Sequence, residues 1–106
     1  MCSLAIVSTT LEHKNDCEKI AQLLLNEKII ACAQVSGPIT SYYPWGGTIE
    51  TATEFRLSLK TTAPLRERVK SRLKELHPYE LPEIMDQTVT GSSIEYVEWV
   101  EQEVIK

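Results

Sequence analysis

The apolar patterns along this chain predict an α+β fold with the element order β-α-β-β-α-β and one further helix at the C-terminus. Residues 29–62 alternate as two strand arms around a double glycine, and residues 17–24 and 65–76 carry apolar positions at helical spacing. This order is the ferredoxin-like arrangement. Right-handed connections then place the first strand and the second hairpin arm at the centre of a four-stranded antiparallel sheet, with the helices on one face.

The first strand and helix follow from residues 4–28. Residues 4–9 are apolar on both faces, which is typical of a central strand. Asn15 or Asp16 is expected to cap the following helix, which ends near residues 26–28. Its buried stripe is predicted to be Cys17, Ile20, Ala21 and Leu24.

The long hairpin turns at Gly46-Gly47, because two residues that tolerate positive φ suit a type I′ turn. The returning arm alternates cleanly, with Phe55, Leu57 and Leu59 on the buried face. The outgoing arm matches this face only if one extra residue is inserted near Gly37-Pro38, so we predict a β-bulge there. The resulting register places Val35 opposite Leu57, Ala33 opposite Leu59 and Cys32 opposite Lys60.

The hairpin is too long for the domain that carries it. At about 3.3 Å per residue, the arm 29–45 would span roughly 55 Å, whereas a compact chain of this length is about 33 Å across. The overhanging part is apolar on both faces: Tyr42, Pro44 and Ile49 on one, and Ile39, Tyr43 and Trp45 on the other. Such a surface needs a cover, and a second copy of the chain is the simplest one. The alternative is a hairpin folded back on its own body.

The remaining elements complete the fold. Pro64 suits the first turn of a second helix, with Leu65, Val69, Leu73 and Leu76 as its apolar stripe. Two prolines make residues 77–82 a rigid connection. Residues 83–89 are expected to form an edge strand, and residues 91–93 a turn and N-cap.

The final helix, residues 94–105, is apolar on more than one side. Ile94, Val97, Val100 and Val104 line one side, while Tyr96 and Trp99 lie partly on another, which is a second indication of assembly. The sheet face without helices is expected to be bare in a monomer, with Ile30, Cys32 and Gln34 pointing to it.

Length and composition favour one domain, residues 1–106. The net charge of −4 argues against a nucleic-acid partner, and no apolar run approaches the ~20 residues of a membrane span. Cys2, Cys17 and Cys32 are an odd set without CxxC spacing, which suits reduced thiols in the cytoplasm.

Several segments together resemble the CutA family of divalent-cation tolerance proteins. They are Ala31-Cys32 with the Gly37-Pro38 kink, Ser41-Tyr42-Tyr43 with Trp45, the arm 54–61, the stretch 76–84 and Tyr96 with Trp99. The resemblance covers nearly the whole chain, and HPYELPEI is its most specific part. It implies a homotrimer with PII-like architecture, the hairpins packed around a three-fold axis, and a role in tolerance of divalent metals, copper especially.

Metal chemistry points to Cys32, His77 and Glu80 as candidate ligands, with Glu83 as a further one, since thiolate and imidazole suit copper, a soft or borderline metal, and Cu(II) is the expected divalent ion. Their spacing fits no local motif, so folding or assembly would have to bring them together. The alternative for His77 is a helix C-terminal residue favoured by the helix dipole. The alternative for Cys32 is a small interface residue.

An intersubunit pocket is a second interpretation, for a small anionic or aromatic ligand. Tyr43, Trp45, Lys60, His77, Tyr79 and Glu80 could line it, and Tyr43, Trp45, Lys60, Tyr79 and Trp99 are our pocket or interface candidates.

No nucleophile elbow, P-loop or dinucleotide fingerprint is present, so we expect no enzyme. We therefore expect a cytoplasmic, homotrimeric, copper-binding protein of metal tolerance. The alternative is a PII-like signalling or scaffold trimer with a small-molecule or protein partner.

Overall fold

The computed structural model describes residues 3–106, so Cys2 of the predicted thiol set lies outside the described residues. The elements follow the predicted order. They are β1 (Leu4–Leu11), α1 (Lys14–Asn26), β2 (Cys32–Trp45), β3 (Thr48–Thr62), a 3-10 turn (Ala63–Leu65), α2 (Arg66–Leu76), β4 (Ile84–Val89) and α3 (Ile94–Glu103). No helix within residues 3–106 has the length and apolar character needed to span a membrane.

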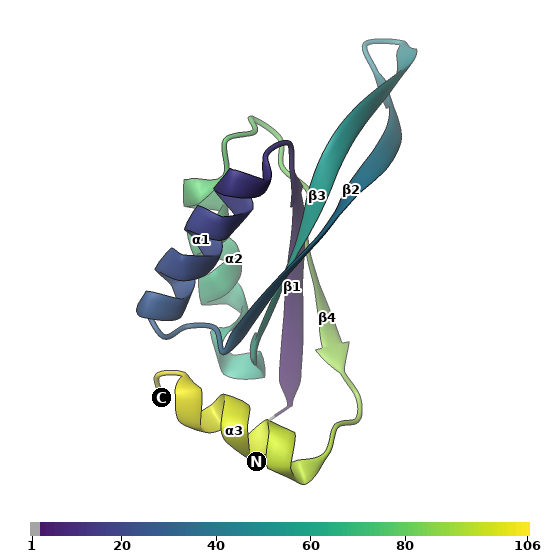
Figure 1. Ribbon diagram of the computed structural model, residues 1–106. Coiled ribbons are helices and arrows are strands. Elements are labelled where there is room, and N and C mark those ends of the chain that lie inside the picture. The colour runs from purple at the N-terminus through teal and green to yellow at the C-terminus, as the bar shows by residue number, and fades with distance from the viewer. Residues whose placement is uncertain (1–2) are drawn as a thin grey trace.

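The four strands form one antiparallel sheet in the order β2-β3-β1-β4, which confirms the ferredoxin-like topology. β1 and β3 are central as predicted, and the short β4 is an edge. Helices α1 and α2 lie together on one face of the sheet, and α3 lies at the end far from the hairpin tip (Figure 1). The main core fills the space under α1 and α2 and includes Val7, Leu11, Leu24, Leu57, Leu59 and Leu73.

The hairpin register is the predicted one. Cys32 pairs with Lys60 and Val35 with Leu57. The pairing shifts between Ser36 and Ile39, so the β-bulge lies at Gly37-Pro38, whose peptide bond is cis. Gly37 has a φ of 134° in a region that L side chains rarely adopt, and an added Cβ would lie 3.1 Å from the Glu54 carbonyl oxygen.

The outer part of the hairpin extends beyond the helices and the rest of the sheet (Figure 1). The chain measures 46 × 26 × 22 Å, and its radius of gyration of 14.6 Å exceeds the ~13 Å of a compact chain of this length. The overhang is therefore confirmed, and the hairpin is not folded back on its own body.

One face assignment was wrong. Ile30 was expected on the bare face with Cys32 and Gln34, but it is buried in the main core beside Ile29 and Leu24. β2 begins only at Cys32, and strand alternation does not apply to the connection before it. Both isoleucines can therefore turn inward there. Cys32 points to the other face of the sheet from the core-packed Ala33, as expected.

The final helix covers the N-terminal end of β1. Ser93 caps it, because the Ser93 hydroxyl accepts a hydrogen bond from the Tyr96 backbone N–H at 3.3 Å. Val97 and Val100 form a second small core with Leu4. Tyr96 packs against this cluster and lies 5.7 Å from Trp99 between ring centroids, while Trp99 remains exposed.

Candidate functional site

His77 fastens the end of α2 to the first strand. Its ring is only 8% exposed, and its Nε2 lies 2.9 Å from both the Thr10 carbonyl oxygen and the Thr9 hydroxyl. Its Nδ1 accepts a hydrogen bond from the Tyr79 backbone N–H at 3.1 Å, so the ring proton belongs on Nε2 and points to the Thr10 carbonyl. Burial lowers the pKa of His77, although Thr10, Glu54 and Asp16 oppose the shift. The neutral ring is thus a docking element of the fold.

Tyr79 connects the rigid loop after α2 to the hairpin. Its hydroxyl donates a hydrogen bond of 2.7 Å to Oε2 of Glu54 on β3, and its ring meets His77 edge-on at a centroid distance of 4.6 Å. Burial, together with the hydrogen bond to Glu54, raises the pKa of Tyr79 far above its ordinary value. Tyr79 therefore stays protonated and keeps its role as a donor.

Glu54 carries a buried negative charge at the foot of the overhang. Its side chain is 8% exposed. Burial raises the pKa of Glu54, but hydrogen bonds from Ser41, Tyr79 and Thr10 and the nearby charge of Arg56 outweigh it, so the pKa lies below the ordinary value. The carboxylate is consequently ionised at neutral pH.

An open groove of about 1090 Å³ lies between the outer hairpin and the loop that follows α2. We call it the hairpin groove. It is lined by Thr10, Glu12, His13, Ser41, Tyr42, Tyr43, Trp45, Thr51, Ala52, Thr53, Glu54, Tyr79, Glu80, Leu81 and Glu83. Four carboxylates and four aromatic rings line it, and no lysine or arginine does, so its charge favours a cation over the anionic ligand considered above.

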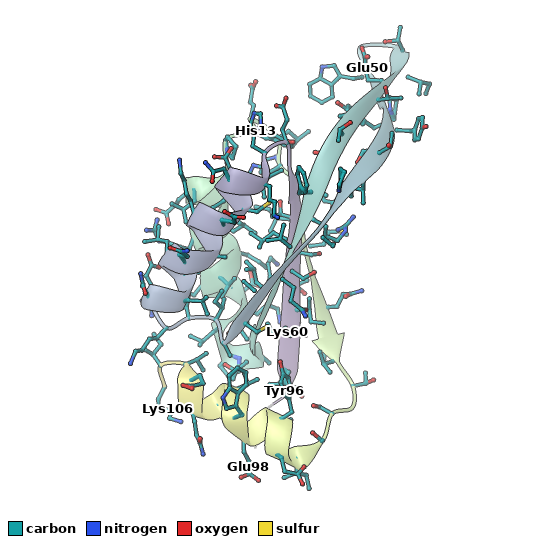
Figure 2. The ribbon with its side chains drawn as sticks, viewed as in Figure 1. His13, Glu50, Lys60, Tyr96, Glu98 and Lys106 are labelled. Carbon is teal, nitrogen blue, oxygen red and sulfur yellow. The ribbon has the colours of Figure 1, made fainter. Side chains whose placement is uncertain are left out.

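The groove gathers four of the residues predicted from the sequence: Tyr43, Trp45, Tyr79 and Glu80. Three other candidates lie elsewhere: His77 does not line the groove but is held against β1. Lys60 is near the base of β3, far from Glu50 at the hairpin tip (Figure 2), and Trp99 is on α3. Their predicted roles at an interface between copies stay predictions.

The three predicted metal ligands do not converge within one chain. His77 contacts Thr9 on the helix-covered side of the sheet, whereas Cys32 lies on the opposite face from the core residue Ala33. Glu80 is exposed in the loop. Over the described part of the chain, no group of three His, Cys, Asp or Glu side chains is arranged to hold a metal ion. Within one chain the three residues form no metal site, and their role as ligands stays a prediction.

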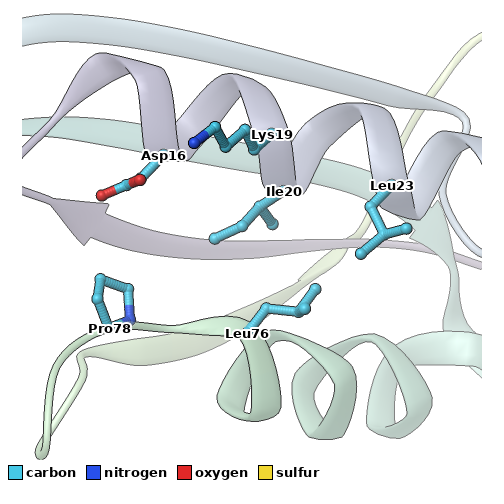
Figure 3. Close-up of a pocket in the computed structure, with 6 residues that line it drawn as sticks. All are labelled: Asp16, Lys19, Ile20, Leu23, Leu76 and Pro78. Atoms are coloured by element: carbon cyan, nitrogen blue, oxygen red, sulfur yellow. The ribbon is translucent and has the colours of Figure 1, made fainter.

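A second, smaller depression of about 180 Å³ lies between α1 and the end of α2. Its walls are the aliphatic side chains of Ile20, Leu23 and Leu76 with Pro78, and Asp16 and Lys19 lie at its rim (Figure 3). None of the predicted site residues lines it. Its volume is below the roughly 300 Å³ at which small-molecule sites begin, so the hairpin groove is the better candidate.

Glu54 is the residue that sequence reasoning missed. Alternation placed it with Arg56 and Lys60 on a polar face, but Tyr79 from the loop after α2 lies against it there, and its side chain is buried. The available signal was its position one residue beyond the predicted bulge, where the faces of the two arms change phase.

Comparison with known proteins extends these observations. The family described as CutA1 divalent ion tolerance protein matches residues 5–103. The divalent-cation tolerance protein CutA of Pyrococcus horikoshii is 38% identical over 97% of this chain and 100% of that one. The crystal structure of divalent ion tolerance protein CutA1 from Ehrlichia chaffeensis superposes with a TM-score of 0.94 at 32% identity, covering 97% of this chain and 96% of that chain. The structure of a periplasmic divalent cation tolerance protein CutA from Archaeoglobus fulgidus gives 0.91 at 30% identity, covering 96% and 99%.

Proposed function

This chain belongs to the CutA1 divalent ion tolerance protein family, and on that premise we propose that it is a homotrimer that binds a divalent metal ion, copper in particular, in metal tolerance. The single observation that carries the role in tolerance is the family match along nearly the whole chain. Catalysis is not part of the proposal. The cytoplasm is the proposed compartment, on the cysteine pattern of the sequence.

The overhang supports the assembly. Tyr42 is 72% exposed, Ile49 70% and Trp45 59%, and they lie on both faces of a two-stranded ribbon. A two-stranded ribbon is marginal in water by itself, and apolar side chains gathered on it form the kind of patch that marks an interaction site. Copies of the same chain would bury these side chains.

The proposed metal ligands are Cys32, His77 and Glu80, supplied by different subunits. A thiolate and an imidazole together favour copper over hard cations such as Mg²⁺. Cys32 is half-buried on the sheet face that α1 and α2 leave open, where a neighbouring copy can approach it. His77 could bind a metal only after releasing one of the bonds that hold it to β1 or to Tyr79.

A second candidate function is a PII-like signalling or scaffold trimer with a small-molecule ligand. The hairpin groove favours it, since its volume and aromatic lining suit a small molecule. The two functions separate at Cys32, which is a proposed metal ligand and does not line the groove, whereas Glu80 belongs to both sites.

Metal retention tests the first proposal. The protein is equilibrated with Cu(II), separated by size exclusion, and the metal in the eluted peak is measured. We expect near-stoichiometric copper on the wild type, loss of copper from Cys32→Ala, and retention by the matched control Cys17→Ala, whose thiol is buried in the core. Glu80→Gln is the second ligand variant, because its exposed side chain makes folding independent of the change.

Two results would contradict the metal proposal. One is a wild type that elutes without copper. The other is equal retention by Cys32→Ala and Cys17→Ala, which would place any bound copper away from the open sheet face.

A further inference from the structure

Glu54 lies at the point where the four-stranded sheet narrows to a two-stranded hairpin. β1 pairs with β3 as far as Leu11 and Phe55, and Glu54 is the next residue of β3 toward the hairpin tip. Among residues 3–106, no third strand pairs with the hairpin beyond this point. The outer hairpin, residues 39–54, therefore leaves the body of the domain at Glu54.

The backbone alone leaves the direction of the outer hairpin weakly defined. The register of β2 against β3 shifts between Ser36 and Ile39, and a β-bulge bends the strand that contains it. A two-stranded ribbon also twists more strongly than a wider sheet. Side-chain contacts at this junction are therefore needed to hold one direction.

The Glu54 carboxylate makes such contacts. Tyr79, in the loop after α2, donates a hydrogen bond of 2.7 Å to its Oε2, and the hydroxyl groups of Thr10 and Ser41 donate to the same carboxylate. Thr10 on β1 and Tyr79 belong to the body, whereas Ser41 belongs to the outer hairpin. One buried group thus ties the outer hairpin to the body through two separate segments.

The loop that carries Tyr79 is itself fixed in place. Pro78 and Pro82 restrict its backbone. Glu83 at its end forms an ion pair of 3.2 Å with Arg56 on β3. The Tyr79 hydroxyl is therefore presented to the hairpin from a stiff support.

Small errors of direction grow along the outer hairpin. The six steps from Glu54 to Thr48 span roughly 20 Å at about 3.3 Å per residue, so a pivot of about 10° would move the tip by roughly 3.5 Å. A gap of about 0.5–1 Å already removes a quarter to a half of the dispersion energy of a contact. The exposed Tyr42, Trp45 and Ile49 can therefore pack against neighbouring copies only if the outer hairpin keeps one direction.

We propose that Glu54 is a positioning residue, which forms a clamp with Tyr79 and Thr10 that sets the direction of the outer hairpin and thereby the fit between copies. The clamp itself acts within a single chain, whereas its effect on assembly rests on the proposed homotrimer. A ring of copies closes only if each contact turns the next copy by the required angle. A loosened clamp would therefore weaken the assembly.

The distance between two spin labels within one chain tests the clamp. Labels at Glu50→Cys, at the hairpin tip (Figure 2), and at Lys74→Cys, on α2, report the direction of the outer hairpin. Labelled protein is mixed with an excess of unlabelled chain, so that only distances within one chain are measured. Ile49→Lys in both chains keeps neighbouring copies from holding the hairpin. The native cysteines are replaced by Cys2→Ser, Cys17→Ala and Cys32→Ala.

Two variants loosen the clamp in steps. Tyr79→Phe removes one tie to the body, and Tyr79→Phe combined with Thr10→Val removes both. We expect a narrow distance distribution with the clamp intact, a broader one in Tyr79→Phe and the broadest in the double variant. Tyr42→Phe makes the same change on an exposed ring of the outer hairpin and should leave the distribution unchanged. If circular dichroism shows that the double variant does not fold, Tyr79→Phe decides.

Light scattering over a dilution series, without labels, tests the effect on assembly. Tyr79→Phe should dissociate at a protein concentration about tenfold higher than the wild type, the equivalent of ~1.4 kcal/mol. Ile20→Val is the control, because it removes a methyl group from the core under α1 without touching the junction. It is expected to dissociate at the same concentration as the wild type.

An unchanged distance distribution in the clamp variants would overturn the clamp. Equal dissociation of Tyr79→Phe and the wild type, or equally early dissociation of Ile20→Val, would overturn its effect on assembly. A wild type of one chain mass at every concentration would contradict the homotrimer and that effect together, and the label distances would still decide whether the clamp acts within the chain.

Discussion

The inner and outer halves of the β2–β3 hairpin share one alternating pattern but lie in opposite environments. Inside the β-bulge, Leu57 and Leu59 are completely buried. Outside it, Tyr42, Trp45 and Ile49 stand in solvent although their positions alternate just as regularly. α1 and α2 cover the inner half, whereas the outer half extends past the helices and meets the described part of the chain only near its base, at the loop after α2 (Figure 1). Alternation therefore determines how strands pair, while neighbouring elements determine what is buried.

The largest expected effect separates the two halves directly. Leu57→Ala removes a fully buried side chain under α1 and α2 and should lower the free energy of unfolding by about 2–5 kcal/mol. Ile49→Ala makes a comparable change in the outer half, and in a single chain it should cost less than about 0.5 kcal/mol. Urea unfolding at several protein concentrations measures both. A loss of stability in Ile49→Ala that depends on protein concentration would show that other copies cover the outer half. A loss in Ile49→Ala as large as that in Leu57→Ala at every concentration would refute the difference between the two halves.

A substitution at the boundary between the halves, the β-bulge, should lower the stability almost as much as Leu57→Ala. Gly37→Ala places a Cβ against the Glu54 carbonyl oxygen and the Phe55 ring at a φ of 134°, and we expect a loss of about 2–3 kcal/mol. Gly91→Ala is the control, because an added Cβ there meets nothing within 4 Å. Thermal or urea unfolding distinguishes the two variants. Similar stability of both would mean that the bulge accommodates a side chain by rearranging.

The connection from the loop to the hairpin should have a smaller effect. Tyr79→Phe removes the donor to the buried Glu54 carboxylate, and hydrogen bonds to charged groups contribute about 1.5 kcal/mol or somewhat more. Tyr42→Phe is the matched control, since its ring is exposed in the outer half. Chemical denaturation should show the loss only for Tyr79→Phe. An unaffected Tyr79→Phe variant would mean that water or Ser41 replaces the lost donor.

The smallest effect is a pH dependence from His77. Its pKa is lowered in the folded chain, so the unfolded chain takes up a proton first as the pH falls through about 6.5. Stability from this residue is therefore complete above pH 6.5 and declines below it, down to the folded-state pKa. Glu27, Glu54 and Asp86 also have lowered pKa values, but their losses occur in the more acidic range below their ordinary values.

Urea midpoints between pH 7.5 and 5.5 measure this slope. His77→Gln should reduce it while lowering stability throughout, and His13→Gln, an exposed histidine on the loop before α1, should preserve it. A slope that survives His77→Gln would assign the titration to another group.

The fold was largely predictable from the sequence because its signals are local. Gly46-Gly47 defined the turn, and the phase mismatch between the arms located the bulge at Gly37-Pro38. The environment of single polar residues was not predictable, because it depends on contacts between distant segments. Glu54 is buried by Tyr79, 25 residues later, and His77 is held by Thr9 and Thr10, 68 and 67 residues earlier. Only the folded chain brings these groups together.

The central claim is that the outer half of the hairpin is an assembly surface, and light scattering coupled to size exclusion tests it most directly. The wild type should elute as one species of three chain masses over a wide range of protein concentration. Ile49→Lys, which puts a charge on the outer half, should lower that mass. A wild type that elutes at one chain mass at every concentration would contradict the account, since Tyr42, Trp45 and Ile49 would then stay exposed in solution.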